Sequence, residues 1–531
     1  MLSGLISTQE TTPCQLRMYK KGFVCICNAT YCDYLDDPTP NNESEFVVVS
    51  TSKAGLRFET TSGLINASES LRIADYDERN DTAKHAFWDT VAFEKAATRS
   101  VKIKVDREKR FQNITGFGGS FTGSVSYLLE NLPQELQDHL YKSFYSQSGI
   151  GFNLMRTPIG GCDFDLEPWA YNEQPENETT LSNFTKLDPR EEKRIEQIKH
   201  LKLVSNVENL RIKAAAWSPP RWMKTNNAWT GSSRLKKEYY QTWADYHLRW
   251  LELWEENGLP LWAISTGNEP TNGVYLMYFL RFMSLGWTPR KQAIWLSENF
   301  GPTIRSKYKD LLIFGVDDQR HTLAFWMKFM NASRADSLHY LGGLTVHWYW
   351  DEIFKPVLID IVHKAMPDKI MLISESCIGD KPWQKSAPIL GSWKRAEKYA
   401  RSFLQNLQQE FNGWLDWNIV LDEKGGPNYV ENFVDAPVIA NMTNRVEVYK
   451  QPIFYTMGHF SKFSPEGSIR IAAERTNINV DTIAFLRPDG GIAVVVFNSG
   501  YASVDVGITD TVRGSIKFQI PAKSIHTILY K

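Results

Sequence analysis

Two glutamates follow two apolar segments that have the length and composition of buried strands. Glu269 lies in LWAISTGNEP (261–270), where an apolar run gives way to small and polar residues and a proline. Glu375 ends a similar run in KIMLISESCIG (369–379). We therefore expect both carboxylates at the carboxyl ends of core strands, facing one pocket.

Two carboxylates in one pocket can cleave a glycosidic bond. One acid protonates the leaving oxygen, and the other carboxylate meets the positive charge that develops on the anomeric carbon. Either glutamate alone is more simply explained as a surface acid, because most glutamates are exposed. The pair, together with the side chains at neighbouring strand ends, predicts a two-carboxylate active site.

Arg156 and Asn268 are candidates to support this pair. Arg156 ends an earlier predicted strand and can hold the nucleophilic carboxylate ionised, although an ordinary salt bridge explains it equally well. Asn268 precedes Glu269, and neighbouring strand residues point to opposite faces unless the strand end twists or bulges. If both side chains reach the pocket, the amide can bond a sugar 2-hydroxyl.

Aromatic residues also stand at predicted strand ends. The hydroxyl of Tyr349, which follows His347 by two residues, can bond Glu375, and a core aromatic cluster is the alternative. Three further residues suit sugar hydroxyls and sugar faces: Asp163, Trp217 and Trp417. For any one tryptophan, core packing is the more common role.

Eight apolar segments alternate with helical segments in the middle of the chain. They are 111–119, 150–164, 210–220, 261–270, 311–320, 341–350, 369–376 and 412–421. This alternation predicts parallel βαβ units, and eight such units close into a barrel whose active site lies at the strand carboxyl ends. Glu269 then follows the fourth strand and Glu375 ends the seventh.

Alternating polar and apolar residues at both chain ends predict solvated β strands. The predicted fold class is α/β, a (β/α)8 TIM barrel with an attached all-β sandwich domain and a small disulfide-knotted β region. The boundaries are 14–40 with 418–449 for the knotted region, 41–111 with 467–531 for the sandwich and 112–417 with 450–466 for the barrel. Residues 76–95 are expected to form an exposed loop, and 418–450 a loop-rich return. The apolar segment 274–287 is either a helix packed on the barrel or a membrane contact.

Four of the six cysteines crowd the start of the chain: Cys14, Cys25, Cys27 and Cys32. They allow three disulfide pairings. Cys25 and Cys27 are separated by one residue and are poor partners for each other, and of the two remaining pairings Cys14–Cys25 with Cys27–Cys32 is favoured. A zinc site is the competing interpretation, but the usual two-residue spacing is absent. The other two, Cys162 and Cys377, are expected to be buried free thiols.

Composition excludes several classes of partner and chemistry. A net charge of -1 gives no reason to expect nucleic acid, and no apolar run approaches the roughly 20 residues of a membrane-spanning helix. The glycines at 116–119 lack the third glycine of a dinucleotide fingerprint, and GxSxG and HExxH motifs are absent, so no cofactor and no metal are expected. Nine Asn-x-Ser/Thr acceptors and the clustered cysteines indicate the secretory pathway.

The chain resembles the lysosomal glucosylceramidase (acid β-glucosidase) family along nearly its whole length. The motifs that carry the resemblance include VCICNATYCD, GFGGSFTGS, RTPIGGCDF, WSPPRWMKTN, GNEP, DDQR, HWYWD, SESCIG, GWLDWN, EKGGPNYVENFVD and SIHTILYK. The resemblance implies a retaining β-glucosidase acting on glucosylceramide, with Glu269 as acid/base and Glu375 as nucleophile. It implies a glucose site lined by Asp163, Trp217, Asn268, Trp417 and Asn432.

The same resemblance implies a lysosomal protein that touches an anionic lipid surface and a saposin-like activator. The segments 226–233 and 276–289 depart from the family pattern in loops that would flank the site. Two other interpretations remain. One is a β-xylosidase or endo-β-glucanase of a related barrel family, and the other is a non-enzymatic glycan- or lipid-binding protein.

Overall fold

The computed structural model describes residues 11–40, 42–73, 99–275, 281–354, 356–381, 383–384, 387–476, 478 and 480–531. The loop expected at 76–95 and residues 276–280 of the apolar segment 274–287 lie outside these ranges.

Eight parallel strands close into a barrel, as predicted. They are β7 (Gly116–Ser120), β8 (Leu154–Ile159), β9 (Arg211–Ala216), β10 (Ala263–Ser265), β11 (Leu312–Gln319), β12 (Gly343–His347), β13 (Ile370–Glu375) and β14 (Gly413–Asn418). Each coincides with one of the eight predicted segments, and only β7 extends past its segment, by the single residue Ser120. Almost every residue of these strands is buried, because the barrel interior covers one face and helices cover the other.

Helices connect successive barrel strands. They are α2 (Gly123–Glu130), α3 (Gln134–Tyr145), α4 (Pro189–Ser205), α5 (Tyr240–Glu256), α6 (Asn272–Tyr275), α7 (Pro289–Trp295), α8 (Gly301–Lys307), α9 (Leu323–Ser333), α10 (Ile359–Ala365) and α11 (Trp393–Leu407). Local sequence sets their ends. In α4, for example, the Asp188 side chain caps the first turn, proline occupies the first helical position, and Asn206 ends the helix in the left-handed conformation.

A five-stranded sheet joins the start of the chain to residues 420–450. Its order is β1 (Leu16–Tyr19), β2 (Gly22–Asn28), β17 (Glu447–Lys450), β16 (Val438–Ala440) and β15 (Val420–Asp422). The expectation of a loop-rich return at 418–450 was therefore incomplete. Three strands of only three or four residues form there because they pair with one another and, through β17, with β2.

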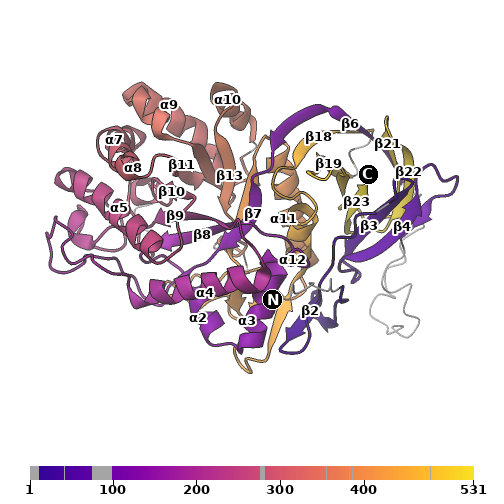
Figure 1. The fold of residues 1–531 in the computed structure, drawn as a ribbon, viewed down its shortest axis with the longest axis horizontal. Helices are drawn as coiled ribbons and strands as arrows, with labels where there is room; N and C mark the ends of the chain where they lie inside the picture. Colours follow the sequence, from indigo (N-terminus) through magenta and orange to yellow (C-terminus); the bar gives the residue numbers. More distant parts are fainter. Residues whose placement is uncertain are drawn as a thin grey trace, which may run out of the picture.

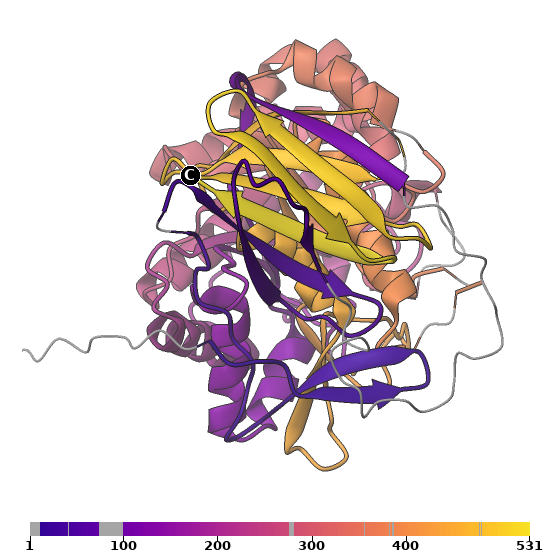
Figure 2. The same cartoon turned by 90° about the vertical axis from the view of Figure 1, so that its right-hand side faces the viewer.

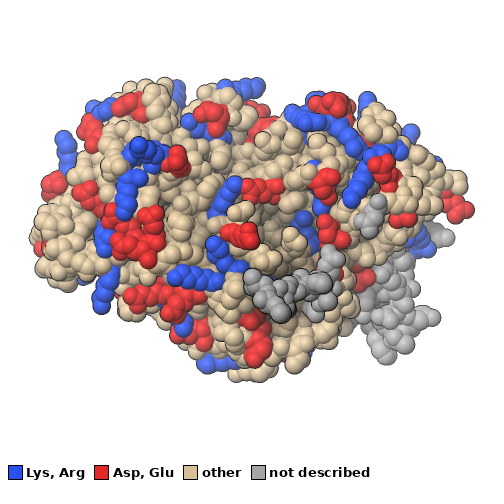
Figure 3. Space-filling view, viewed as in Figure 1, with Lys and Arg blue, Asp and Glu red and all other residues tan. Residues whose placement is uncertain are grey.

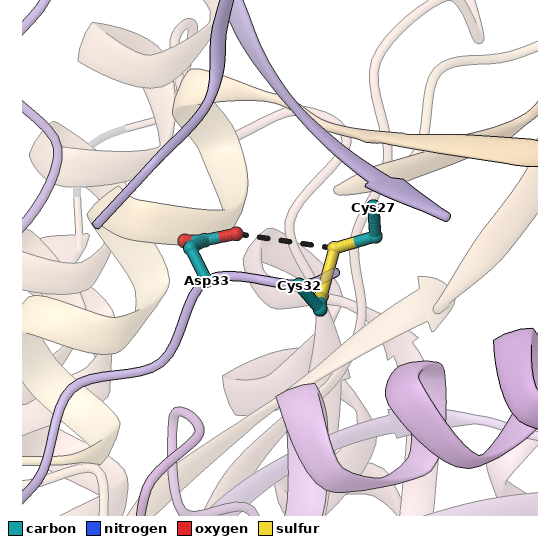
Figure 4. A group of neighbouring side chains, drawn as sticks. All are labelled: Cys27, Cys32 and Asp33. Carbon is teal, nitrogen blue, oxygen red and sulfur yellow. Dashed lines mark hydrogen bonds between the residues drawn. A yellow bond between two sulfur atoms is a disulfide. The ribbon is translucent and has the colours of Figure 1, made fainter. Parts of the chain in front are cut away.

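The predicted disulfides are confirmed. Cys14 is bonded to Cys25 and Cys27 to Cys32, with Cα–Cα distances of 5.3 and 4.4 Å. The Asp33 carboxylate lies beside the second disulfide, with 3.9 Å between Asp33 Oδ1 and Cys27 Sγ (Figure 4). Since all four sulfur atoms are used in disulfides, the zinc interpretation is wrong. The remaining thiols, Cys162 and Cys377, are free and buried as expected.

Both chain ends contribute to one sheet of ten strands. Its order is β4 (Glu59–Leu64), β3 (Glu45–Ser52), β23 (Ser524–Tyr530), β20 (Ile492–Asn498), β19 (Asp481–Leu486), β18 (Ile469–Arg475), β6 (Arg99–Asn113), β21 (Val504–Asp510), β22 (Gly514–Ile520) and β5 (Leu71–Arg72). Figure 2 shows the early strands running beside the last ones. Every residue of β20 and β23 is buried, whereas β4 alternates between half-buried and exposed residues, as an edge strand does.

The last helix, α12 (Pro452–Ser461), links the barrel to this sheet. All ten of its residues are buried, because it packs against α11 on one side and against β3 and β23 on the other (Figure 1). A helix that is buried all round belongs to an interior, so the two parts share a packed boundary.

Acidic and basic side chains are interspersed over the face shown in Figure 3. Within the described ranges, no helix is long and apolar enough to cross a membrane. Of the apolar segment 274–287, residues 274–275 end α6, whereas residues 281–287 are not helical, and Met283, Leu285 and Trp287 are buried. These three side chains therefore pack against the protein and are not available to a membrane.

Candidate active site

The two glutamates reach the carboxyl-terminal end of the barrel in different ways. Glu375 is the last residue of β13. Glu269 comes four residues after the end of β10, where Gly267 has φ of 126° and Glu269 itself has φ of 44°. This turn of the backbone leaves regular strand geometry, and hydrogen bonds from Asn268 N to Ala216 O and from Glu269 N to Asp317 O hold it. As a result, Asn268 and Glu269 can both face the site although they are neighbours.

Glu375 is almost fully buried and accepts two hydrogen bonds. The Arg156 guanidinium donates to Oε2 through Nη1, and the Tyr349 hydroxyl donates to Oε1 at 2.6 Å. The second arm of the same guanidinium, Nη2, donates to Asn268 Oδ1 at 2.6 Å. Charge-assisted bonds of this kind favour an ionised carboxylate.

Glu269 accepts hydrogen bonds on both carboxylate oxygens. Gln319 Nε2 lies 2.7 Å and His347 Nδ1 lies 2.9 Å from Oε1, and the Asn272 amide donates to Oε2. Gln319 and Asn272 were missed from the sequence. Gln319 belongs to the DDQR motif, which marked the end of a predicted strand, so a signal for it existed. Asn272 lies on a single turn of helix that no pattern indicated.

One carboxylate oxygen of Glu269, one of Glu375 and one ring nitrogen of His347 lie within 4.8 Å of one another. Burial alone would lower the pKa of His347, but the surrounding carboxylates of Glu375, Asp317 and Glu269 raise it to about 10. An imidazolium has no free lone pair for a metal ion. The group is therefore best described as a charged ring between acids.

Asp317 is a further residue that the sequence did not single out. Val316 and Asp317 have φ of 73° and 48°, and the register between β11 and β12 shifts at this point. The carboxylate is fully buried, and Oδ2 accepts from Lys213 Nζ at 2.8 Å. Burial alone would raise the pKa of Asp317, but the charges of Lys213 and Arg156 hold it well below its ordinary value.

Two buried oxygen atoms near the glutamates lack hydrogen-bond partners within the described part of the chain: Asp163 Oδ1 and Gln319 Oε1. Burial, with the nearby charges of Glu375 and Glu269, raises the pKa of Asp163 well above its ordinary value. A buried acceptor without a partner is costly, so a ligand hydroxyl or amide would satisfy either atom.

Trp217 and Trp417 stack on each other, with ring centroids 5.3 Å apart and planes 22° apart. The carbon of the Arg156 guanidinium lies 4.8 Å and 5.3 Å from their centroids, which is cation–π distance. Both indoles are 2% exposed. They therefore pack against Arg156 and each other, and very little of either indole is exposed.

Asn432 is the one predicted site residue that the structure does not connect to this group. It is half-buried, and its main chain is bonded to the Asn428 side chain. Among the described residues, no hydrogen bond joins its own side chain to either glutamate.

Comparison with known proteins identifies similar chains. Residues 114–464 match the description "Glycosyl hydrolase family 30 TIM-barrel domain", and residues 467–528 match "Glycosyl hydrolase family 30 beta sandwich domain". The lysosomal acid glucosylceramidase of Mus musculus is 34% identical over 96% of this chain and 93% of its own length. Putative glucosylceramidase 4 of Caenorhabditis elegans is 32% identical over 99% and 97%.

Two solved structures share the fold at lower identity. SrfJ from Salmonella typhimurium has a TM-score of 0.76 and 22% identity, covering 92% of this chain and 99% of its own. The endo-beta1,6-glucanase BT3312 has a TM-score of 0.74 and 21% identity, covering 91% and 99%.

Proposed function

The chain belongs to glycosyl hydrolase family 30, and from this premise and its geometry we propose that it is a retaining β-glucosidase that hydrolyses glucosylceramide to glucose and ceramide. The observation that carries the proposal is that one carboxylate oxygen of Glu269 lies within 4.8 Å of one carboxylate oxygen of Glu375, a closeness that favours the narrower of two known spacings. Retaining enzymes hold their carboxyl groups about 5–5.5 Å apart, whereas inverting enzymes need roughly 6.5–9.5 Å to fit a water molecule.

The reaction takes two steps. Glu375, held as a carboxylate by Arg156 and Tyr349, attacks the anomeric carbon while Glu269 gives its proton to the ceramide oxygen. Glu269 then takes a proton from water, and the resulting hydroxide displaces Glu375 and releases glucose. Two displacements at the same carbon return the β configuration.

We assign the glucose site to Asp163, Asn268, Trp217, Trp417 and Asn432. The partnerless Asp163 Oδ1 suits a sugar hydroxyl, and the Asn268 amide is held next to Glu269 by Arg156. Asn432 is assigned by resemblance, and its half-buried position is compatible with a side chain that turns toward bound sugar. On the leaving-group side, Gln319 Oε1 suits a donor on the lipid.

Exposed apolar side chains support contact with a lipid surface. They lie on α9, on α10 and in the loops after β12 and β13, which leave the same end of the barrel as the glutamates: Phe325, Phe329, Ile353, Phe354, Leu358, Ile361 and Trp383. Clustered exposed apolar groups mark interaction sites. A lipid substrate in an anionic membrane, or a saposin-like activator that presents it, fits this position.

We place the protein in the lysosomal lumen or along the secretory route to it. The two disulfides require an oxidising compartment, and a lysosomal relative is 34% identical.

The test is hydrolysis of a fluorogenic β-glucoside and the matching β-xyloside at pH 5 by the wild type and Glu375→Gln. We expect glucoside turnover that the substitution abolishes, with β-glucose as the first product by NMR. A mechanism-based epoxide should label Glu375. Turnover of the xyloside in preference to the glucoside would favour the xylosidase alternative. Equal signals from both proteins, or none, would favour a binding protein.

Lipid specificity needs a separate assay with glucosylceramide in vesicles that contain anionic phospholipid. Ceramide release should rise with the anionic fraction. Turnover of the fluorogenic glucoside without any ceramide release, with or without a saposin-like activator, would restrict the enzyme to other β-glucosides.

A further inference from the structure

Asp317 contacts side chains from several barrel strands of the site, although it does not face the ligand. Its Oδ1 accepts from Ser374 Oγ at 2.6 Å and from Thr345 Oγ1 at 3.0 Å. Its Oδ2 accepts from Lys213 at 2.8 Å and lies 3.4 Å from Arg156 Nη2. The partners come from β8, β9, β12 and β13, so this carboxylate sits among four barrel strands other than its own.

Asp317 also lies behind the ring that separates the two glutamates. His347 Nε2 is 3.4 Å from Asp317 Oδ1, and His347 Nδ1 is 2.9 Å from Glu269 Oε1 and 3.9 Å from Glu375 Oε1. The ring is fully buried. Asp317 is the carboxylate on the side of the ring away from the substrate, and its contact with the ring is an ion pair at 3.4 Å, since Nε2 makes no hydrogen bond within the described part of the chain.

The charges around this carboxylate are close to balanced. Three cations, Arg156, Lys213 and the His347 ring, face the carboxylates of Asp317 and Glu375, and Glu269 joins these two once it has given up its proton. A further titratable group beside the ring is Tyr349, whose ring centroid lies 6.0 Å from that of His347 and whose pKa burial raises well above its ordinary value. Asp163 lies near the charges of Glu375 and Glu269. Removing one carboxylate leaves an uncompensated buried positive charge.

We propose that Asp317 is a positioning residue that keeps His347 doubly protonated and aims Arg156 at Glu375, so that one buried carboxylate sets the environment of both catalytic glutamates. The proposal rests on the proposed function. The imidazolium keeps its proton throughout. When Glu269 passes its proton to the leaving oxygen, the positive ring stabilises the new carboxylate, and this stabilisation persists until water returns a proton to Glu269.

The first variant is Asp317→Asn, which keeps the shape of the side chain and removes its charge. Asp416→Asn is the control for an Asp-to-Asn change at a buried barrel-strand position, because Asp416 bonds Tyr399 (2.8 Å) instead of the ring, and burial raises its pKa well above its ordinary value, so this change removes less charge. We expect kcat/KM to fall about 100-fold or more in Asp317→Asn, the scale of a lost buried charge partner, and little in the control.

The second variant separates positioning from charge balance. Asp317→Asn with Lys213→Met removes both members of the pair joined at 2.8 Å, which should restore most of the lost thermal stability. The double variant also provides the test if Asp317→Asn alone does not fold. We expect its activity to stay low, because His347 still lacks the neighbouring carboxylate. Recovery of wild-type activity would show that Asp317 only balances Lys213 and would overturn the proposal.

The decisive readout is the protonation of His347, followed through the 15N signals of its ring and assigned by comparison with His347→Gln. In the wild type the ring should stay doubly protonated to at least pH 8. In Asp317→Asn it should lose its proton at a pH lower by two units or more. An unchanged titration would overturn the proposal. Because this measurement needs no turnover, a wild type without glucosidase activity would refute the proposed function separately.

Discussion

Arg156 and Glu375 form a buried ion pair across the barrel, and the other arm of the same guanidinium holds Asn268. The two stacked indoles beneath it restrict the guanidinium further, since both centroids lie within 5.3 Å of its carbon. One planar side chain therefore fixes the nucleophile and the amide that precedes the acid/base. Only arginine offers two donors in a fixed fork with a flat face for stacking.

Arg156→Lys should lower kcat/KM by about 100-fold or more. A lysine ammonium cannot bond the Glu375 carboxylate and the Asn268 amide oxygen at the same time, and it does not stack on the indoles in the same way. Steady-state kinetics with a fluorogenic glucoside measure the loss. Arg190→Lys is the matched control, because Arg190 also pairs with a carboxylate (Asp188) and lies over an indole, but is partly exposed. Its activity should be close to that of the wild type. Equal losses of kcat/KM in both variants would show that the two-donor geometry of the Arg156 guanidinium is not responsible for the loss.

Tyr349→Phe removes the 2.6 Å hydrogen bond to Glu375 and a weaker 3.6 Å contact of the hydroxyl with Cys377 Sγ. We expect kcat to fall about 10- to 100-fold, since a donor aimed at the nucleophile is lost. Tyr399→Phe removes a comparable buried bond to Asp416 and should cost stability instead of activity. If Tyr349→Phe kept the wild-type kcat, the hydroxyl would have only a structural role.

The alternation of short apolar and helical segments in the sequence predicted the barrel but not every residue of its site. Short apolar runs separated by helical segments located all eight strands and put Glu269 and Glu375 at strand ends. Asp317 was not predicted because its orientation depends on positive φ at Val316 and at Asp317, and a β-branched residue such as valine rarely adopts that conformation. No propensity predicts a conformation that only the surrounding barrel imposes.

The five-stranded sheet was not fully predicted for a different reason. β15 and β16 have three residues each, and their sheet is completed by β2, which is about 400 positions earlier in the chain. A strand of that length has no measurable period, so only tertiary pairing defines it. The favoured pairing of the adjoining disulfides is confirmed, although the cysteine spacing itself excluded only a bond between Cys25 and Cys27.

His347→Gln should change how stability depends on pH above neutrality. The pKa of His347 in the folded protein, about 10, is above its unfolded value of about 6.5. The stabilisation from its charge is therefore complete below about pH 6.5 and is lost as pH rises toward 10. Thermal unfolding from pH 6 to 10 should show a gap between wild type and variant that narrows with rising pH. A difference in unfolding temperature between wild type and variant that stays constant with pH would contradict a charged His347 ring.

The two disulfides should differ in what they contribute to stability. They close loops with sequence separations of 11 and 5 residues. Chain entropy predicts losses of about 3 kcal/mol for Cys14→Ser with Cys25→Ser and about 2 kcal/mol for Cys27→Ser with Cys32→Ser. Urea unfolding measures both, and turnover at low temperature should be retained because the bonds lie away from the glutamates. The opposite ranking would show that native contacts outweigh loop length.

His526 should make the protein lose stability in acid, independently of the active site. Its fully buried ring bonds Ser50 at 2.9 Å and Ser524 at 2.8 Å, and burial lowers its pKa to about 3. The unfolded chain takes up a proton near pH 6.5, so this contribution to stability is complete above that pH and is lost as pH falls toward 3.

The expected linkage is about 3 kcal/mol between pH 7 and 4, at 1.36 kcal/mol per unit of pKa difference. His526→Gln cannot titrate, so it should start less stable at pH 7 and lose less on acidification. Ser524→Ala, which removes one bond to the ring without removing the titrating group, should lose stability in parallel with the wild type. Parallel curves for His526→Gln and the wild type would assign the acid sensitivity to other groups, such as the buried His459, whose pKa burial also lowers.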